Sequence, residues 1–511
     1  MNASKLRFLV SSFRFLVAVN QKLETTNLKL LFLRVLCVLC ASALRSCSLH
    51  AAGAADEPVT FNKHVAPIIF ANCTGCHRDG EVAPFALNNY ADAKSHAKQI
   101  ARVTKSRFMP PWKAEPGYGD FHDARRLSDQ QIATITKWVE QGSIEGNAAD
   151  LPPAPQFKDG WSLGEPDLIL KMPEAYTVPA EGKDVYRCFV LPMDIPEDKY
   201  VAAVEYRPSN RKVVHHALFF LDTTGAARRK DAQDPEPGYK SFAGPGIIPT
   251  GGLGGWAPGA FARRLSDDAG RKMNKGSDFV LQIHFHPSGK PEKEQSSVGI
   301  YFTKKTPEKV VQGFALRSRK IDIPPGEKNY KVSDTYVTPI DTQLLGITPH
   351  AHLICREMKA EATLPDGKIQ PLIWIKDWDF NWQDQYLYEK PLKLPKGTKL
   401  SMEFTYDNSA ENIRNPSNPP KRVTWGEQTE DEMAILFLQF VPERASDAGL
   451  MRQGMLKKLL QSLSGEGIGA LSGKRGEMLK EMMNAFDKDG DGKLSDEEKA
   501  ELVQKLQSAG Q

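Results

Sequence analysis

Six of the eleven histidines in this 511-residue chain fall into three tight clusters, and these clusters carry the clearest chemical signal in the sequence. The clusters are His215 with His216, His284 with His286, and His350 with His352. Two histidines at positions i and i+2 of a strand share one face, so both rings can reach one metal ion. Adjacent histidines point to opposite faces of an ideal strand, and an unpaired imidazole in a core is costly. Three clusters in one β-rich region therefore predict metal binding rather than six separately satisfied side chains.

The choice of metal depends on the ligands that accompany the histidines. Imidazole alone suits zinc, copper, iron or nickel. A catalytic zinc hydrolase would usually add a general-base carboxylate beside its ligands, and the nearest weak candidate is Glu357. The segment TEDEMAILFLQF (429–440) instead offers Met433 at the start of an apolar strand. A thioether added to two imidazoles favours copper, and Cu(I) especially.

A second motif, ANCTGCH (71–77), has the C-x-x-C-H spacing of a covalent haem site. Cys73 and Cys76 lie about one helical turn apart and would form the two thioethers, and His77 would then be the proximal ligand of the iron. The alternatives are a redox C-x-x-C and a fragment of a zinc site. They need a thioredoxin-like βαβ context or a second ligand pair, and the sequence has neither.

We expect the sixth iron ligand to be Met109, which precedes two prolines in SRFMPPWK (106–113) and is the single methionine between residues 56 and 148. A thioether ligand raises the haem potential and suits electron transfer. The alternative is that Met109 is a core residue. Weaker candidates for the ligand are His64, His96 and His122. Residues 56–148, in which apolar side chains recur at helical spacing, thus resemble a small all-α, c-type cytochrome domain.

A third motif, FDKDGDGKLSDEE (486–498), matches the calcium loop of an EF-hand. The expected ligands are Asp487, Asp489, Asp491, Lys493 through its carbonyl, Ser495 and Glu498. The alternative is an acidic, solvated loop between two helices. EF-hands usually pair, and residues 450–470 could supply a degenerate partner helix. We expect bound Ca²⁺ to have a structural rather than a signalling role.

Between the haem and calcium motifs the pattern changes from helical to β. A Pro-rich linker at 149–160 is followed by short apolar or alternating runs separated by Gly and Pro clusters. This pattern predicts two tandem antiparallel β-sandwiches, jelly-roll-like, at 161–308 and 309–445. A helical tail at 446–511 contains the EF-hand motif.

Residues 1–55 have the features of an export signal. Basic residues precede the apolar run VLCVLCASAL (35–44), and small residues follow it in HAAGAAD. The run is too short for a comfortable membrane span, although a retained anchor or a lipid on Cys47 is an alternative. We expect an exported protein, periplasmic or extracellular. In such a compartment Cys188 and Cys355 could form a disulfide, or they could be two buried free thiols.

The overall charge and composition exclude one class of partner. The formal net charge is +4 and no long basic block occurs, so nucleic acid is a poor candidate. No segment after the N-terminal signal is typical of a transmembrane span.

The order of the metal motifs resembles one enzyme family. An HH pair, a later Q-x-H-F/Y, an H-x-H and a D-E-M occur in the same order in the copper type II, ascorbate-dependent monooxygenases, which include the peptidylglycine α-hydroxylating and dopamine β-monooxygenases. The resemblance covers roughly residues 160–445. It includes GGWAPG (254–259), YDNSAENIRNPSNPP (406–420) and WGEQTEDEM (425–433).

The resemblance implies two β-sandwiches that each carry one copper, with an open cleft between them. The electron-transfer copper would be bound by His215, His216 and His284, and the oxygen-binding copper by His350, His352 and Met433. Ligation by two adjacent histidines requires a twist or a bulge in their strand. His286 is not a ligand in the family pattern and is expected outside the first coordination sphere or at the surface. The implied reaction is hydroxylation of an unactivated C–H bond, with one atom of O₂ entering the substrate and the other becoming water.

The sequence departs from the peptide-amidating members at three positions. Thr348 stands where those members have an arginine for a peptide carboxylate, and Ile435 and Phe437 stand where they have an asparagine and a tyrosine. A less charged, small organic substrate is therefore expected, together with O₂ and an external electron donor. Fusion to a haem domain suggests that the haem passes electrons to the copper at His215, His216 and His284. The alternative is a non-catalytic haem and copper protein that acts in electron transfer or copper handling.

Overall fold

The computed structural model describes residues 57–464, apart from short gaps at 80, 82, 158–159, 242–243, 248, 259 and 427, and also Ser495 and Glu498. The predicted export signal therefore lies outside the described residues. So do four of the expected calcium ligands, namely Asp487, Asp489, Asp491 and Lys493.

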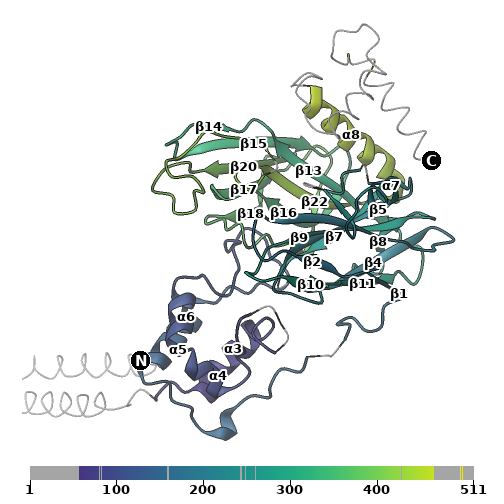
Figure 1. Cartoon of the computed structure of the whole chain (residues 1–511). Helices are drawn as coiled ribbons and strands as arrows, with labels where there is room; N and C mark the ends of the chain where they lie inside the picture. Colours follow the sequence, from purple (N-terminus) through teal and green to yellow (C-terminus); the bar gives the residue numbers. More distant parts are fainter. Residues whose placement is uncertain are drawn as a thin grey trace, which may run out of the picture.

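The described chain begins with a small helical unit that has its own hydrophobic core (Figure 1). Its elements are η1 (Phe61–Val65), α3 (Ala66–Asn72), α4 (Tyr90–Ser95), α5 (Ala97–Lys105), α6 (Asp129–Glu140) and η2 (Ala148–Asp150). Phe61 and Trp138 are fully buried at its centre, with ring centroids 5.9 Å apart. Ser128 begins α6 with a capping box, in which its side chain accepts from Gln131 N–H and the Gln131 side chain accepts from Ser128 N–H.

Two β-sandwiches follow, so the fold is predominantly β, as the sequence predicts. In the first sandwich, one sheet has the order β6-β3-β9-β5-β7 and the other β1-β11-β4-β8-β12. The strands are β1 (Leu168–Lys171), β3 (Val185–Leu191), β4 (Lys199–Arg207), β5 (Val214–Asp222), β6 (Tyr239–Lys240), β7 (Gly251–Trp256), β8 (Ala269–Met273), β9 (Asp278–Phe285), β11 (Ser297–Phe302) and β12 (Lys309–Val310). All eight residues of β9 are buried, because β9 is the central strand of its sheet.

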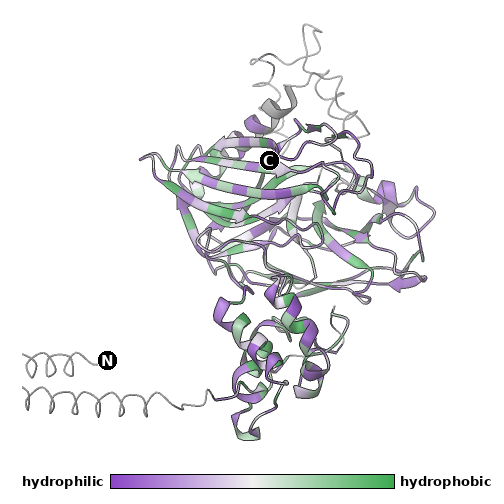
Figure 2. Ribbon diagram, turned by 90° about the vertical axis from the view of Figure 1, so that its left-hand side faces the viewer, coloured by the Kyte–Doolittle hydropathy of each residue, from purple (hydrophilic) through white to green (hydrophobic). Residues whose placement is uncertain are grey.

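The second sandwich packs the sheet β13-β22-β16-β19 against the sheet β15-β20-β17-β18. Its strands are β13 (Gln312–Ser318), β15 (Tyr330–Val337), β16 (Thr342–His350), β17 (Cys355–Thr363), β18 (Ile369–Ile375), β19 (Tyr386–Leu394), β20 (Lys399–Tyr406) and β22 (Ala434–Pro442). Two short ribbons pair β2 (Tyr176–Val178) with β10 (Glu292–Glu294) and β14 (Asp322–Ile323) with β21 (Val423–Thr424). Hydrophobic and hydrophilic residues alternate along many strands, as expected when one face of a sheet is buried (Figure 2).

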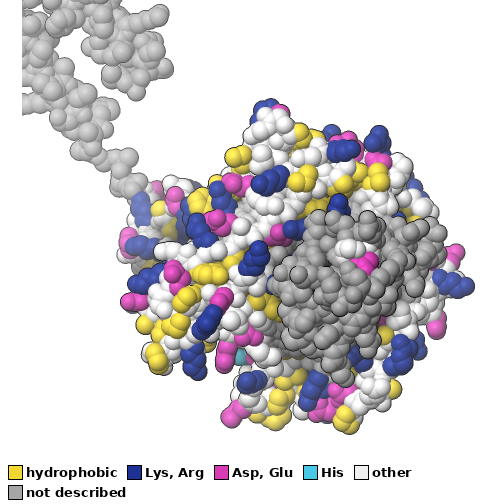
Figure 3. Space-filling view, turned by 90° about the horizontal axis from the view of Figure 1, so that it is seen from above, with side chains coloured by type: hydrophobic (Ala, Val, Ile, Leu, Met, Phe, Trp, Pro, Cys, Tyr) yellow, Lys and Arg dark blue, Asp and Glu magenta, His cyan; other side chains and the backbone are white. Residues whose placement is uncertain are grey.

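Outside the helical unit, the described residues form the helices α7 (Ala226–Asp231), η3 (Ala445–Asp447) and α8 (Ala448–Ser464). Met451 and Met455 of α8 pack into the core of the second sandwich, on the side away from the helical unit (Figure 1). Seen from above, acidic and basic side chains are interspersed on the visible face (Figure 3). Within the described residues no helix is long and apolar enough to cross a membrane.

The helical unit is not packed independently of the sandwiches. The segment between α5 and α6 enters the core of the second sandwich through Trp112, Ala114 and Phe121. It forms isolated antiparallel bridges, Ala114 with Ile375 and Phe121 with Tyr388. The sequence boundaries assigned all of residues 56–148 to one helical domain, whereas the structure shows that part of this range is buried elsewhere.

Cys188 and Cys355, for which the sequence left a disulfide and two free thiols as alternatives, are both free thiols in the structure. Each is buried, Cys188 in β3 beside Tyr239 and Ile247, and Cys355 in the main core of the second sandwich. The alternative of two buried thiols is the one that the structure supports.

Candidate metal centres

The first histidine centre lies on the neighbouring strands β5 and β9. His216 is directly opposite His284, whereas Val214 pairs with Phe285, so the strand β5 has one extra residue at His215. This β-bulge interrupts the regular alternation of side chains between the two faces of the sheet, so His215 need not point away from His216. It is the distortion that joint ligation by two adjacent histidines requires.

The three imidazoles of this centre are close enough to share one metal ion. His215, His216 and His284 each offer a ring nitrogen, and these atoms lie within 4.8 Å of one another. Nδ1 of His216 is 3.1 Å from Nδ1 of His215 and 3.4 Å from Nδ1 of His284. Three converging nitrogen donors of this kind suit copper, zinc or iron.

An acidic residue that the sequence analysis did not single out orients this centre. Asp184 accepts a hydrogen bond from Nε2 of His284 at 2.8 Å, which leaves Nδ1 of His284 for the other two histidines. The second oxygen of Asp184 pairs with Nδ1 of His286, whose side chain is 68% exposed. His286 therefore lies outside the group of three histidines and is linked to it through Asp184. Tyr186 stacks on the opposite side of the centre, with its ring 4.2 Å from that of His284.

The protonation state of these histidines favours metal binding. Burial, together with the nearby His284, lowers the pKa of His215 to about 3. Burial also lowers the pKa values of His216 and His284, although Asp184 partly opposes the shift at His284. Neutral imidazole is the form that binds metals, so near neutral pH all three rings are available as ligands.

The second centre is built by the pairing of β16 with β22. His350 lies opposite Ile435 at the end of the pairing; His352 follows β16 and Met433 precedes β22. The rings of His350 and His352 have centroids 5.4 Å apart. Nδ1 of His350 is hydrogen-bonded to Gln383 Oε1, and Nδ1 of His352 is 3.0 Å from the carbonyl oxygen of Asp431. These contacts use Nδ1 of each ring, and Met433 is buried.

The buried carboxylate of Glu432 holds this second centre together. Oε2 accepts hydrogen bonds from the backbone N–H groups of His352 (2.8 Å) and Met433 (3.2 Å). Oε1 accepts from those of Ile354 (2.7 Å) and Cys355 (3.2 Å). Burial raises the pKa of Glu432 to about 8, while the four N–H donors act in the opposite direction. One side chain thus fixes the positions of a histidine and of the methionine next to it.

The C-x-x-C-H motif forms a tight turn at the end of α3. The backbone N–H groups of Cys76 and His77 both donate to the carbonyl oxygen of Cys73, and both cysteines are free thiols. Nδ1 of His77 is 3.0 Å from the carbonyl oxygen of Phe85. This hydrogen bond leaves Nε2 of His77 as the available ligand atom, which fits a proximal haem ligand.

The other predicted iron ligands lie elsewhere in the helical unit or at its edge. Met109 is half-buried in the loop after α5, where its N–H donates to the carbonyl oxygen of Val103. Nδ1 of His64 accepts from the N–H of Thr60, and the ring of His96 stacks on that of Phe85 at 3.8 Å. His122 lines a cavity at the boundary with the sandwiches.

That cavity, of about 300 Å³, joins the haem motif to both sandwiches. Cys76 contributes to its lining from the helical unit, Trp256 from the first sandwich and Leu387 from the second. Ion pairs tie the helical unit to the sandwiches around it, Glu81 with Arg211 at 2.7 Å and Arg125 with Asp384 at 2.6 Å. Cys76 therefore lies where the helical unit meets the two β-sandwiches.

Two further features carry less chemistry. Among the expected calcium ligands, Ser495 and Glu498 are described. The backbone N–H of Ser495 donates to Glu498 Oε2 at 2.7 Å, and the backbone N–H of Glu498 donates to Ser495 Oγ at 3.3 Å.

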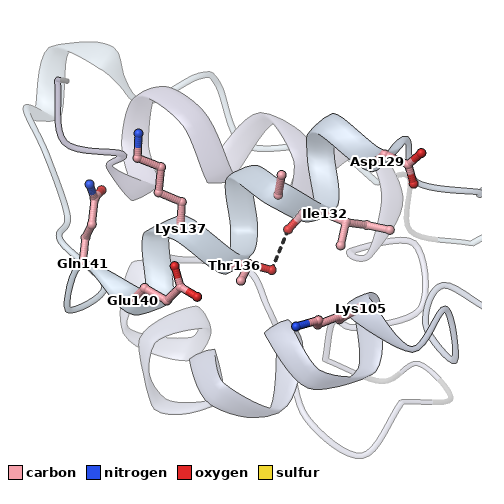
Figure 4. Close-up of a pocket in the computed structure, with 8 residues that line it drawn as sticks. Lys105, Asp129, Ile132, Thr136, Lys137, Glu140 and Gln141 are labelled. Atoms are coloured by element: carbon pink, nitrogen blue, oxygen red, sulfur yellow. Dashed lines mark hydrogen bonds between the residues drawn. The ribbon is translucent and has the colours of Figure 1, made fainter.

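A hollow of about 650 Å³ on the surface of α6 is lined by Lys105, Asp129, Ile132, Ala133, Thr136, Lys137, Glu140 and Gln141 (Figure 4). Its lining holds neither histidine nor cysteine, and its charges are of both signs.

Comparison with known proteins provides no assignment. No family model and no curated protein matches the chain. The major capsid protein P2 of bacteriophage PM2 is similar over 54% of this chain and 97% of its own, with 8% identity and a TM-score of 0.22. PNGF-II is similar over 54% of this chain and 66% of its own, with 10% identity and a TM-score of 0.24. A structure of the Gx strain of infectious bursal disease virus covers 59% and 77%, with 8% identity and a TM-score of 0.18. Scores this low support no argument about this chain.

We expect Glu432→Gln to destabilise the fold, because the amide NH₂ faces backbone donors that need an acceptor. Each unsatisfied buried donor costs about 1–3 kcal/mol. Two such donors predict a loss of about 2–5 kcal/mol, measured by chemical denaturation followed by tryptophan fluorescence. The exposed neighbour Glu430→Gln is the matched control. Equal denaturation midpoints for the two variants would contradict the role of Glu432.

Proposed function

We propose that this protein is a copper-dependent monooxygenase that hydroxylates a C–H bond of a small organic substrate, as its resemblance to the copper type II monooxygenases implies. The observation that carries the proposal is the presence of two different donor sets on two successive sandwiches. One consists of His215, His216 and His284, and the other would consist of His350, His352 and Met433, the last two of which share Glu432 as a backbone acceptor. Copper bound at both would supply O₂ activation and the two electrons that each hydroxylation consumes.

The two donor sets suit different tasks. Three clustered imidazoles, with His284 buried and held by Asp184, make a compact centre of strong nitrogen donors, which suits storage and delivery of one electron. Two imidazoles and a thioether make a softer centre with fewer strong donors, which suits Cu(I) and leaves room for O₂. Glu432 holds the backbone of both His352 and Met433, so this second set is pre-organised by the protein.

The surface beside His350 supports an apolar substrate. Ile435 and Phe437 lie on the same outward face of β22, and Thr348 is directly opposite Phe437. The Phe437 side chain is 45% exposed, which is unusual for a large apolar residue and suits contact with a ligand. Arg317 lies across from Ile435 on β13, but it already has interaction partners. We infer that the substrate is held mainly by its apolar body.

The haem motif supports an internal electron supply. In the proposed arrangement Cys73, Cys76 and His77 bind haem c, with Met109 as the second axial ligand. Cys76 borders the cavity that both sandwiches line, so a haem held by Cys73, Cys76 and His77 would be attached beside both sandwiches. A one-electron donor outside the chain would reduce the haem, and the haem would reduce the centre at His215. Export to an oxidising compartment and a calcium-stabilised C-terminal tail complete the proposal.

Incorporation of labelled oxygen tests the reaction. With ¹⁸O₂, a reductant and a panel of small substrates, we expect one ¹⁸O atom in the product, measured by mass spectrometry. Met433→Ala should lower the rate by at least a hundredfold, whereas Met193→Ala, which removes a buried methionine of the first sandwich, should retain activity. Neutral, apolar substrates should react faster than peptide carboxylates. If every substrate remains unlabelled while haem and copper are present, the non-catalytic electron-transfer alternative is the better explanation.

A separate measurement tests the haem ligands. We expect Met109→Ala to lower the reduction potential of the haem, because a methionine axial ligand raises it. Spectroelectrochemical titration of the haem-loaded chain would measure the change. Phe108→Ala, which removes the exposed neighbouring side chain, is the control. An unchanged potential in Met109→Ala would show that another residue, such as His96 or His122, is the ligand.

A further inference from the structure

One aromatic ring touches a ligand of each candidate metal centre. Phe380 lies in the loop 376–385, which connects β18 to β19. Its ring stacks on His215 of the first centre, with centroids 5.7 Å apart and an interplanar angle of 23°. It also meets the ring of His352 of the second centre at 5.9 Å and 85°. The His215 and His352 rings are therefore separated by no more than the sum of these two distances.

Other residues of this loop hold Phe380 against both centres. Gln383 Oε1 accepts from Nδ1 of His350, and Gln383 Nε2 donates to the carbonyl oxygen of Phe380 at 3.1 Å. Gln385 Nε2 donates to the carbonyl oxygen of Gly255 in the first sandwich at 3.2 Å. Trp378 Nε1 donates to the carbonyl oxygen of His352 at 3.0 Å. The loop belongs to the second sandwich but is bonded to both.

The helical unit anchors the same loop. Asp384 pairs with Arg125 at 2.6 Å, and Asp377 pairs with Lys113 at 3.1 Å. Both partners belong to the segment between α5 and α6, part of which is buried in the second sandwich. Asp384, Arg125 and Cys76 line the same cavity. The loop is thus the structural link between the haem motif and the two histidine centres.

The family resemblance implies an open cleft between the coppers, whereas here a phenyl ring contacts both sides. Burial lowers the pKa values of His216 and His350, and each is lowered further by a histidine of the opposite centre, which agrees with a short separation. An apolar ring in this position excludes water from the space between the centres, and charges interact more strongly there as a result.

We propose that Phe380 is a positioning residue, whose ring sets the distance between the two metal centres and keeps water out of the space between them. The loop 376–385 makes the position of this ring depend on the docking of the helical unit. The inference rests on the proposed function. Metals held by His215, His216 and His284 and by His350, His352 and Met433 would supply the exchange of one electron, the first being oxidised as the second is reduced. The ring itself gains and loses no electron.

The test compares Phe380→Ala and Phe380→Leu with Phe314→Ala, which removes a ring from the second sandwich away from both centres. Each copper-loaded variant is first analysed for copper, and is then studied by electron paramagnetic resonance in H₂O and D₂O. We expect two coppers in every variant. In Phe380→Ala we expect changed dipolar coupling between the coppers and stronger deuterium modulation, with at least a tenfold slower electron transfer between centres by stopped flow. Phe380→Leu keeps an apolar side chain, so its coupling, deuterium modulation and transfer rate should lie between those of Phe380→Ala and the wild type. If the alanine variant does not fold, the comparison is made with Phe380→Leu.

A further variant tests the link to the helical unit. Asp384→Asn weakens the pair with Arg125 and should change the coupling and hydration in the same direction as Phe380→Ala, with copper content unchanged. Phe380 variants that match Phe314→Ala in coupling, hydration and electron-transfer rate, with two coppers bound, would overturn this inference but leave the proposed function intact. Fewer than two coppers in the wild type would overturn both.

Discussion

Burial of uncharged imidazole rings is the constraint on which the site depends. A polar ring in an apolar interface is costly unless its nitrogens have partners. His284 satisfies this need with Asp184 on one nitrogen, His350 with Gln383 and His352 with the carbonyl oxygen of Asp431. In each case the hydrogen bond uses one nitrogen and leaves the other for a metal. The same contacts that make burial tolerable therefore also prepare the rings as ligands.

Strand pairing fixes the positions of these rings. A bulge of one residue in β5 brings His215 to the side of His216 and His284, and the register of β16 with β22 after Gly346 brings His350 opposite Ile435, two residues after Met433. A slip of one residue in either pair would turn the ligands to the wrong face. Glu432 locks the second pair, because it accepts from the backbone on both sides of the register.

Local sequence patterns predicted much of this arrangement. Apolar runs separated by Gly and Pro predicted the β-sandwiches, and the histidine clusters predicted metal binding, whereas the grouping of His215 and His216 with His284 and the bulge were implied by the family resemblance. Contacts between residues distant in sequence were not predictable. Asp184 is 100 residues from His284, and Glu432 is 80 residues from His352, so neither spacing has a periodic signature. The D-E-M motif contained Glu432, but its role is visible only in the bonds that it accepts.

Two features depended on contacts between distant segments. The sequence left open whether Cys188 and Cys355 form a disulfide or remain free, and the fold buries the two thiols in different cores. The helical domain was delimited by its helices, whereas Trp112 and Phe121, which lie between two of them, are buried in the core of the second sandwich. The helical unit and the second sandwich therefore share a core, and ion pairs from the same segment reach the loop 376–385.

The central claim is that the chain holds two metal centres with different ligands, and copper content per chain tests it most directly. Elemental analysis of haem-loaded protein should give two coppers. The content should fall to one in His350→Ala, which removes a ligand of the methionine centre, and to one in His284→Ala, which removes a ligand of the other. A value of one or none in the wild type would contradict the two-centre account.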